Sequence, residues 1–482
     1  MTVPVTERSA LSLAFAIRSG ELTARSVVDA HIAVLKRAAP RINALVADRF
    51  DAACAEADDA DARVTASNAA ETLPPLLGVP FTVKESIAVA GMPQSAGLVA
   101  RAGVRASQSA STVSRLRAAG AIPLGVTNTS ELTLWIESVN RLYGRTSNPY
   151  APGRAAGGSS GGEGAAVGSG GSPFGLASDI GGSIRVPALF CGVFGHKPSS
   201  GLVPTSGNFP PCEAGNSRLL GVGPIARRAE DLIAVLRIIA GPDGFDTTTQ
   251  PAEIGDPAAV SLEGLRVVIA EGTSWRPISR ELHDARERAA GALAAAGARI
   301  RRVRMPSWRF ALLPFLARLQ AGSTSTTADL VAASQGRQPR RTRLLAPGGP
   351  HTMATRLTLL GEALPDTGSK ALLARAHELA AELRTVIGDG VLLHPAHRGP
   401  APRNGTTVGR PWLLTPAAIF NLAEVPVTEV PIGRSARGLP LGVQVAGPIG
   451  HDHVTIAVAM ALERAFGGWS PPALRGDRHA HS

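Results

Sequence analysis

The chain has 482 residues, of which 44% are hydrophobic and 4% aromatic, and its 49 Lys and Arg residues exceed its 38 Asp and Glu residues by a net charge of +11. The basic residues are scattered and lack interleaved aromatic residues, so nucleic acid is not an expected partner. The sequence has no signal-peptide pattern, no run of about 18 apolar residues and only three cysteines, which predicts a soluble cytoplasmic protein without a transmembrane segment.

The N-terminal region, residues 1–70, is predicted to be helical. Val28, Ile32 and Leu35 recur at helical spacing after Thr23, a candidate N-cap residue. After residue 75, short apolar strands alternate with helices. The predicted elements are a helix over 111–119, a strand over 121–126, a helix over 229–240, a strand over 265–270, a helix over 280–296, and strands over 298–303, 391–393, 427–432 and 441–447.

This alternation predicts an α/β fold with a mixed or parallel sheet covered by helices on both faces. Residues 306–385 have a weaker strand–helix rhythm, and we interpret them as a variable region on the substrate side or a surface flap. The Pro- and Gly-rich segment 395–405 is predicted to be a loop that could cover a site.

Two glycine-rich runs carry the main functional signal: GGSSGGEG at 157–164 and DIGGSIR at 179–185. Glycine lets the backbone turn tightly and aim several N–H groups at one point. Ser183 follows a strand-like segment, so it is a candidate nucleophile for acyl transfer. The predicted oxyanion-hole amides are those of Ile180, Gly181, Gly182 and Ser183.

A serine nucleophile needs a partner that removes its proton. No histidine lies between residues 157 and 185, although His196 and Lys197 follow closely. Lys84 is one of only four lysines in an arginine-rich chain. Because a buried lysine can lose its proton and arginine cannot, Lys84 is a candidate base, with chance placement as the alternative.

Other kinds of site are poorly supported by the sequence. The glycine-rich runs match neither the P-loop pattern nor the lipase-type GxSxG pattern around Ser183. His394 with His397, and His451 with His453, lack the helix or acidic company of a metal site, so we expect no metal and no cofactor.

The run from GGSSGGEG through DIGGSIRVPALFCGVFGHKP resembles the signature of the amidase signature family. The resemblance extends over nearly the whole chain and includes GVPFTVKESIAVAGMP near the start and FNLAEVPVTEVPIG near the end. Within the family, VKES, WIES, YGRTSNPY and FGHKPSSG are most similar to fatty-acid amide hydrolases, particularly the second mammalian type. The resemblance implies a single amidase domain over 1–482, built on one large mixed β-sheet, with a catalytic core over 75–245.

The resemblance also implies roles for individual residues. Ser183 matches the nucleophile that forms the acyl-enzyme, Ser159 the bridging serine after a cis peptide bond, and Lys84 the lysine that takes the proton through Ser159. Ser160 and Arg185 match supporting positions. Glu85 departs from the aspartate that many members have after the lysine.

The leading hypothesis is therefore an amidase that hydrolyses the C–N bond of a hydrophobic carboxylic acid amide, with a small molecule as its partner and possible homodimerisation. The alternatives are the glutamine-hydrolysing subunit of a tRNA-dependent amidotransferase, or a non-catalytic binding protein. Candidates for an apolar acyl pocket, each also an ordinary core residue, are Trp135, Trp308, Phe310, Phe315 and Trp412.

Overall fold

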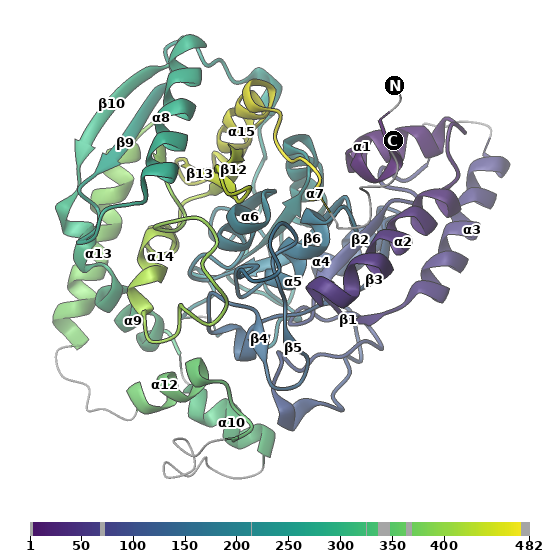
Figure 1. Ribbon diagram of the computed structural model, residues 1–482, viewed down its shortest axis with the longest axis horizontal. Helices are drawn as coiled ribbons and strands as arrows, with labels where there is room; N and C mark the ends of the chain where they lie inside the picture. The colour runs from purple at the N-terminus through teal and green to yellow at the C-terminus, as the bar shows by residue number, and fades with distance from the viewer. Residues whose placement is uncertain are drawn as a thin grey trace.

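A computed structural model describes residues 3–67, 73–213, 215–323, 325–335, 348–362 and 369–473 of the chain. Within these residues, one sheet of eleven strands runs through the molecule (Figure 1). Its strands, in spatial order, are β1 (Leu45–Asp48), β3 (Ile122–Thr127), β2 (Pro80–Lys84), β6 (Phe174–Asp179), β8 (Gly221–Ala226), β7 (Phe194–Lys197), β12 (Val427–Arg434), β13 (Pro440–Ala446), β11 (Val391–His394), β9 (Arg266–Glu271) and β10 (Arg299–Arg304). A separate hairpin joins β4 (Val139–Asn140) and β5 (Gly144–Arg145).

Helices surround this sheet. The α-helices are α1 (Ala10–Arg18), α2 (Ala24–Ile42), α3 (Phe50–Ala66), α4 (Ser111–Ala118), α5 (Gly161–Gly168), α6 (Arg185–Cys191), α7 (Ala229–Ile239), α8 (Arg280–Ala295), α9 (Leu312–Ala321), α10 (Thr327–Gln335), α12 (Met353–Gly361), α13 (Ser369–Ile387), α14 (Thr415–Leu422) and α15 (Asp452–Phe466). Short 3₁₀ helices are η1 (Val5–Glu7), η3 (Val99–Arg101), η4 (Glu131–Thr133), η5 (Pro257–Ala259), η6 (Pro306–Phe310) and η7 (Pro411–Leu414).

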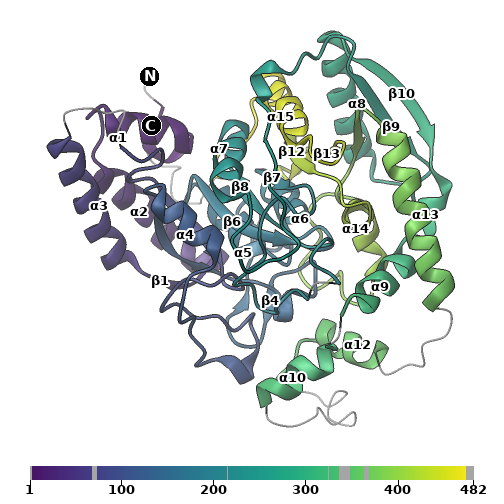
Figure 2. The same cartoon turned by 180° about the vertical axis from the view of Figure 1, so that it is seen from behind.

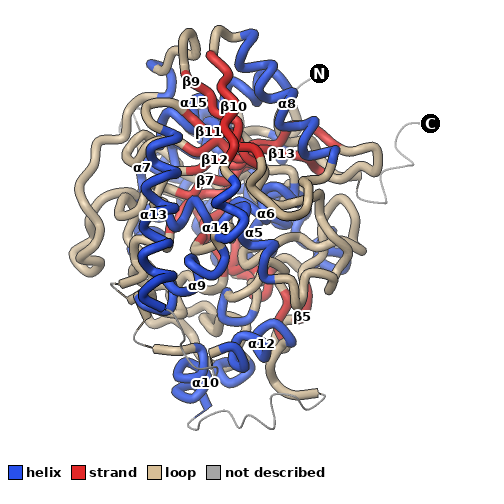
Figure 3. Tube along the Cα trace, turned by 90° about the vertical axis from the view of Figure 1, so that its left-hand side faces the viewer, coloured by secondary structure: helices blue, strands red, loops and turns tan. Residues whose placement is uncertain are grey.

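The sheet is mixed. Three neighbouring strands, β3, β2 and β6, run parallel, as do β11, β9 and β10 at the other end. The strands between these two groups pair antiparallel. The prediction of one mixed sheet covered on both faces is confirmed, and Figure 3 shows its strands enclosed by helices.

Successive side chains along a strand point to opposite faces of the sheet, and on β9 they belong to two different hydrophobic cores. On β9, Val267 and Ile269 belong to the core that includes α8, whereas Val268 and Ala270 belong to the core that includes α13 and α14. Figures 1 and 2 show α1, α2 and α3 at one end of the molecule and β9, β10 and α13 at the other.

The predicted elements occur where the hydrophobic pattern places them. Helix α2 begins after Thr23, whose side chain accepts a hydrogen bond from the N–H of Ser26, and Val28, Ile32 and Leu35 are buried as expected. Of the strands of the large sheet, the sequence analysis missed β1, β2, β7 and β8. Strand β8, GVGPIA, contains two glycines and a proline and therefore has little strand propensity of its own.

The predicted division into 1–70, 75–245 and 306–385 stays a prediction, and parts of it, at 68–70, 336–347 and 363–368, lie outside the described residues. In the described part of 306–385, the chain forms helices and no strand. Helices α10 and α12 lie at the lower margin of the molecule in Figures 1 and 2, away from the strands of the sheet.

Parallel strands bring their carboxyl ends to one edge of a sheet, where sites commonly form. Lys84 is the last residue of β2, Thr127 the last of β3 and Asp179 the last of β6. Three chemically distinct side chains from distant parts of the sequence therefore meet at this edge.

Candidate active site

Lys84 and Ser159 lie in direct contact at the edge of the sheet. Lys84 Nζ donates to Ser159 Oγ at 2.7 Å and to Ser178 Oγ at 3.0 Å. Lys84 is fully buried and Ser159 is 1% exposed. The bonds direct the lysine amine at hydroxyl groups, and no carboxylate pairs with it among the described residues.

The loop before α5 holds Ser159 in place. The Gly158–Ser159 peptide bond is cis, as the resemblance implies. Ser138 Oγ donates to the carbonyl of Ser159 at 2.7 Å and accepts from the N–H of Gly161 at the same distance. Ser138 thus ties both sides of Ser160 to the neighbouring chain.

The turn that carries Ser183 is organised by Asp179. One Asp179 oxygen accepts from the N–H of Gly182 at 2.8 Å, and the other accepts from the N–H of Ile184 at 3.0 Å. Both oxygens also accept from the Arg185 guanidinium at 2.9 Å. An aspartate bonding the amides that follow it is a common way to fix a tight turn.

These bonds involve one amide of the predicted oxyanion hole, which stays a prediction. The N–H of Gly182 donates to Asp179 Oδ1 at 2.8 Å, so it already has an acceptor within the turn. The N–H groups of Ile180, Gly181 and Ser183 have no hydrogen-bond partner among the residues that the structure describes. The backbone at Gly182 has a φ of +113°, a conformation that favours glycine, so this residue shapes the turn.

Ser183 itself lies in this turn with 9% of its surface exposed, more than Lys84 or Ser159. Phe315 of α9 and Ala417 of α14 pack against Gly181 and Gly182, respectively. The turn is therefore enclosed by two helices that come from the C-terminal half of the chain.

Burial changes the protonation of the groups beside Ser159. It lowers the pKa of Lys84 to about 7, even though Asp179 and Glu163 nearby favour the charged amine. Burial also raises the pKa of Glu163 to about 8, against the effect of hydrogen bonds from Thr82 and Thr127. Near neutral pH the amine of Lys84 is therefore partly unprotonated, as a base requires.

Asp179 has the opposite balance. Burial alone would raise its pKa, but the Arg185 guanidinium and the hydrogen bonds that Asp179 accepts hold the pKa below its usual range. Arg185 is fully buried and also donates to Gln444 Oε1 at 2.7 Å and to the carbonyl of Ala417 at 2.9 Å. The pair is thus a charged, fully hydrogen-bonded support beneath the Ser183 turn.

The sequence analysis missed four residues that shape this site. Ser178 contacts Lys84, Asp179 fixes the turn, Ser138 holds the Ser159 loop, and Asn421 Nδ2 donates to Asp179 Oδ1 at 3.0 Å. An aspartate followed within three residues by two glycines, as in DIGG at 179–182, is a recognisable turn signal, so Asp179 could have been found. The other three serve ordinary loop, strand and helix positions and carry no such signal.

Other predicted residues lie around this centre or outside it. Ser160 Oγ donates to the carbonyl of Ser178 at 3.3 Å. Glu85 accepts from the N–H groups of Ser95 and Ala96 at 2.6 and 2.8 Å, so it holds a neighbouring loop. His196 bonds to Asp452 and Thr428 and does not join the Lys84 cluster.

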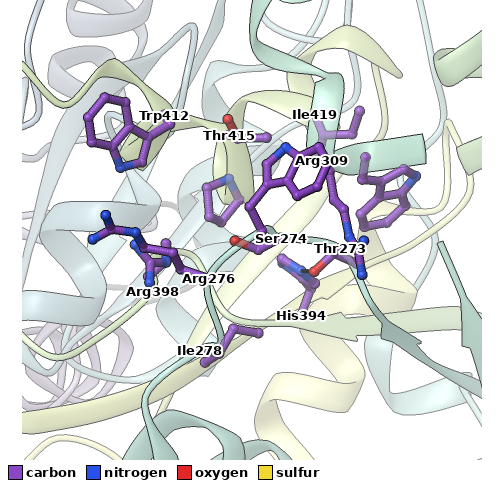
Figure 4. Close-up of a pocket in the computed structure, with 13 residues that line it drawn as sticks. Thr273, Ser274, Arg276, Ile278, Arg309, His394, Arg398, Trp412, Thr415 and Ile419 are labelled. Carbon is purple, nitrogen blue, oxygen red and sulfur yellow. Dashed lines mark hydrogen bonds between the residues drawn. The ribbon is translucent and has the colours of Figure 1, made fainter. Parts of the chain in front are cut away.

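The aromatic candidates divide between a cavity and other positions. A cavity of about 310 Å³ is lined by residues of the β9–α8 loop, η6, β11, the loop after it, η7 and α14 (Figure 4), and Trp308 and Trp412 are among them. Phe315 packs against the Ser183 turn instead. Phe310 is exposed and contacts Trp275, and the Trp135 indole N–H donates to Thr407 Oγ1 at 2.8 Å.

No group of three or more His, Cys, Asp or Glu side chains suited to a metal ion occurs among the described residues. His394 is a cavity residue bonded to Thr273, and His397 contacts the carbonyl of Gly399. None of the helices in the part of the chain that the structure describes has the length and apolarity needed to cross a bilayer.

Comparisons with known proteins agree on the family. The family model described as Amidase matches residues 26–456. Fatty-acid amide hydrolase 2-B from Danio rerio is 40% identical over 98% of this chain and 92% of its own length. A subunit of the glutamyl-tRNA(Gln) amidotransferase from Deinococcus radiodurans is 34% identical over 95% of this chain and 97% of its own length. The solved structure of 6-aminohexanoate cyclic dimer hydrolase complexed with substrate has a TM-score of 0.83 and 25% identity, and covers 97% of this chain and 99% of that one.

Proposed function

The chain belongs to the amidase family and is an amide hydrolase, and we propose that it works through an acyl-enzyme on Ser183, with Ser159 and Lys84 completing a catalytic triad. The proposed substrate is the amide of a hydrophobic carboxylic acid, with a fatty or an aryl or aliphatic acyl group. The identity of 40% to a fatty-acid amide hydrolase supports this substrate class.

In the proposed first step, Ser183 Oγ attacks the amide carbonyl. Its proton passes to Ser159 Oγ while the proton of Ser159 passes to the neutral amine of Lys84. The N–H groups of Ile180, Gly181 and Ser183 would stabilise the negative oxygen that develops on the carbonyl. Asp179 and Arg185 would keep these amides in position, because they fix the turn without touching the substrate.

In the second half, the proton held by Lys84 returns through Ser159 to the amide nitrogen as the C–N bond breaks. An amine or ammonia leaves, and the acyl group remains on Ser183. A water molecule then attacks the ester while its proton passes through Ser159 to Lys84. That proton returns through Ser159 to Ser183 Oγ as the acyl–oxygen bond breaks, which releases the carboxylic acid. Protonation of the departing nitrogen is what makes an amide cleavable, since an unprotonated amine anion is a poor leaving group.

The observation that carries this proposal is the contact of 2.7 Å between buried Lys84 Nζ and Ser159 Oγ. A protonated lysine could only donate to that hydroxyl. With its pKa lowered to about 7 by burial, the amine can also accept the hydroxyl proton. Structural lysines normally keep their charge and an acidic partner, so this combination favours a base.

Labelling by a fluorophosphonate tests the nucleophile directly, because the reagent phosphonylates an activated serine. We expect the protein to be labelled and the Ser183→Ala variant to lose both labelling and amide turnover. The matched control is Ser172→Ala, which removes a buried hydroxyl that donates to the carbonyl of Phe174. Labelling that persists in the Ser183 variant would disprove its role.

The alternative function as part of an amidotransferase is separated by substrate. Faster ammonia release from glutamine than hydrolysis of acyl anilides would favour that function. We expect acyl anilides to be hydrolysed faster than glutamine. A protein that binds amides without hydrolysing any of them would support the non-catalytic alternative.

A further inference from the structure

The cavity of about 310 Å³ adjoins the Ser183 turn through α14. Thr415, Pro416 and Ile419 of this helix line the cavity, and Ala417, between them, packs against Gly182. Ile419 and Trp308 of the cavity also share a hydrophobic core with Phe315, which packs against Gly181. Helix α14 therefore contacts both the cavity and the Ser183 turn.

Three arginines line the cavity, and no acidic residue does. Arg276, Arg309 and Arg398 form no ion pair among the residues that the structure describes. In Figure 4, Arg276 and Arg398 lie next to each other near Trp412. Burial and the neighbouring charge of Arg276 both lower the pKa of Arg398, which places two positive charges together without compensation.

Two of the cavity residues also have N–H groups without an acceptor. Arg398 Nε and Trp308 Nε1 are buried and bond to nothing in the described structure. Arg398 uses another nitrogen to donate to the carbonyl of Pro277 at 3.2 Å, which orients its side chain. A buried donor without a partner is costly, so a ligand that brings an acceptor is favoured here.

The remaining lining combines three tryptophans and the apolar residues Ile278, Pro416 and Ile419 with the polar residues Thr273, Ser274, His394 and Thr415. Trp275 and Trp412 are 67% and 45% exposed, whereas Trp308 is 1% exposed, so the cavity extends from an open aromatic rim to a buried floor. Arg309 lies over the Trp275 ring at 5.4 Å and donates to the carbonyl of Gly272 at 2.8 Å. A ligand with an apolar body and an anionic end fits both kinds of lining.

From this arrangement we propose that the enzyme prefers amides that carry a carboxylate at the end remote from the scissile bond, bound by Arg276 and Arg398. This inference rests on the proposed function and narrows its substrate class. Guanidinium groups match the planar geometry of a carboxylate and can bind it through paired hydrogen bonds. The carboxylate can belong to the acyl part or to the amine part of the substrate, and two pairs of compounds distinguish them.

The first pair is the anilide of octanoic acid and the monoanilide of octanedioic acid, which places the carboxylate on the acyl part. The second pair is N-butyloctanamide and N-octanoyl-γ-aminobutyrate, which places it on the amine part. We expect kcat/KM to be higher for the carboxylate member of one pair by about 10- to 100-fold, mainly through KM. Equal values within both pairs would overturn the inference.

Variants then assign the preference to the cavity. The double variant Arg276→Gln with Arg398→Gln should reduce the ratio of kcat/KM between carboxylate and neutral substrates by most of that factor. The matched control is Arg280→Gln, an arginine of α8 whose side chain is 94% exposed. A ratio that survives the double variant, or falls equally in the control, would place the recognition elsewhere.

Binding separates failure of this inference from failure of the proposed function. The Ser183→Ala protein is titrated with octanamide and with octanedioic acid monoamide. Tighter binding of the second compound, lost with the two arginine substitutions, supports the carboxylate site even if no amide is hydrolysed. Hydrolysis of neutral anilides with no preference in binding or turnover would instead retain the proposed reaction and remove the carboxylate site.

Discussion

The Ser183 turn and the neighbouring cavity hold positive charge in opposite ways. Arg185 is fully buried, and Asp179, Gln444, Asn421 and the carbonyl of Ala417 accept its hydrogen bonds. In the cavity, Arg276 and Arg398 lie next to each other without an acid. Less than one helical turn of α14 joins the two regions, because Ala417 contacts the turn and Pro416 lines the cavity.

The difference shows what each region is built to do. A charge satisfied by the protein's own groups fixes geometry, as a turn that must aim several amides requires. A partly buried charge left without a partner, as at Arg398, costs stability unless a ligand supplies the counter-charge. We therefore interpret the turn as the reaction centre and the cavity as the determinant of substrate choice.

The largest expected effect comes from removing the base. Lys84→Ala should reduce kcat/KM for an anilide by about 100- to 10,000-fold, because both deprotonation of the nucleophile and protonation of the departing nitrogen are lost. The matched ester should lose less, since an alcohol leaves more easily. Steady-state kinetics on an anilide and the ester of the same acid measure both losses, and equal losses would argue against protonation of the nitrogen by Lys84.

Removing the buried support should be the next largest effect. Arg185→Met leaves Asp179 charged and unpaired in the interior, which should lower the free energy of unfolding by about 3–5 kcal/mol. Denaturant unfolding measures this loss. If Arg185 also positions the turn, kcat should fall more than KM changes, and the variant Asn421→Ala should reduce kcat in the same direction with a smaller loss of stability.

The pH profile gives a moderate effect with a defined sign. Burial lowers the pKa of Lys84 to about 7, and in the proposed mechanism the unprotonated amine is the active form. We expect kcat/KM to rise with pH and level off above about 7, with a fall of about tenfold per pH unit below that value. A profile without this limb would contradict the assignment of Lys84 as the base.

The same shift predicts a dependence of stability on pH. Above about pH 7 the folded protein binds fewer protons at Lys84 than the unfolded chain does, up to the ordinary lysine pKa of 10.5. The contribution of this residue to the free energy of unfolding therefore rises with pH across that window. Comparing Lys84→Met with the unsubstituted protein over that range isolates it, because the variant lacks the rise.

The smallest expected effect is in the cavity. Arg276→Gln should change the free energy of unfolding by no more than about 0.5 kcal/mol, because this exposed guanidinium has no ion pair to lose among the described residues. Thermal denaturation beside Arg185→Met makes the contrast direct. A large destabilisation by Arg276→Gln would mean that the cavity arginines support the fold after all.

Much of the fold could be predicted because capping residues and hydrophobic periodicity are visible in short stretches of the sequence. Helix α2 has its N-cap at Thr23 and a buried stripe at Val28, Ile32 and Leu35, and both features are visible in the sequence. Strand β8 was missed because its two glycines and its proline have low strand propensity, although the strand is buried. The contact between Lys84 and Ser159 was anticipated through the family resemblance, and their separation in the chain could not have indicated it alone.

The sequence by itself determined the α/β class with a helix-covered sheet, the two glycine-rich loops and the chemical types of the reacting groups, because these depend on local periodicity and on the backbone freedom of glycine. Only the tertiary structure decided the lowered pKa of Lys84, the hydrogen bond from the Gly182 amide to Asp179 and the proximity of Arg276 to Arg398. Burial and hydrogen bonding between distant segments set these properties, and neither is encoded in any one stretch of chain.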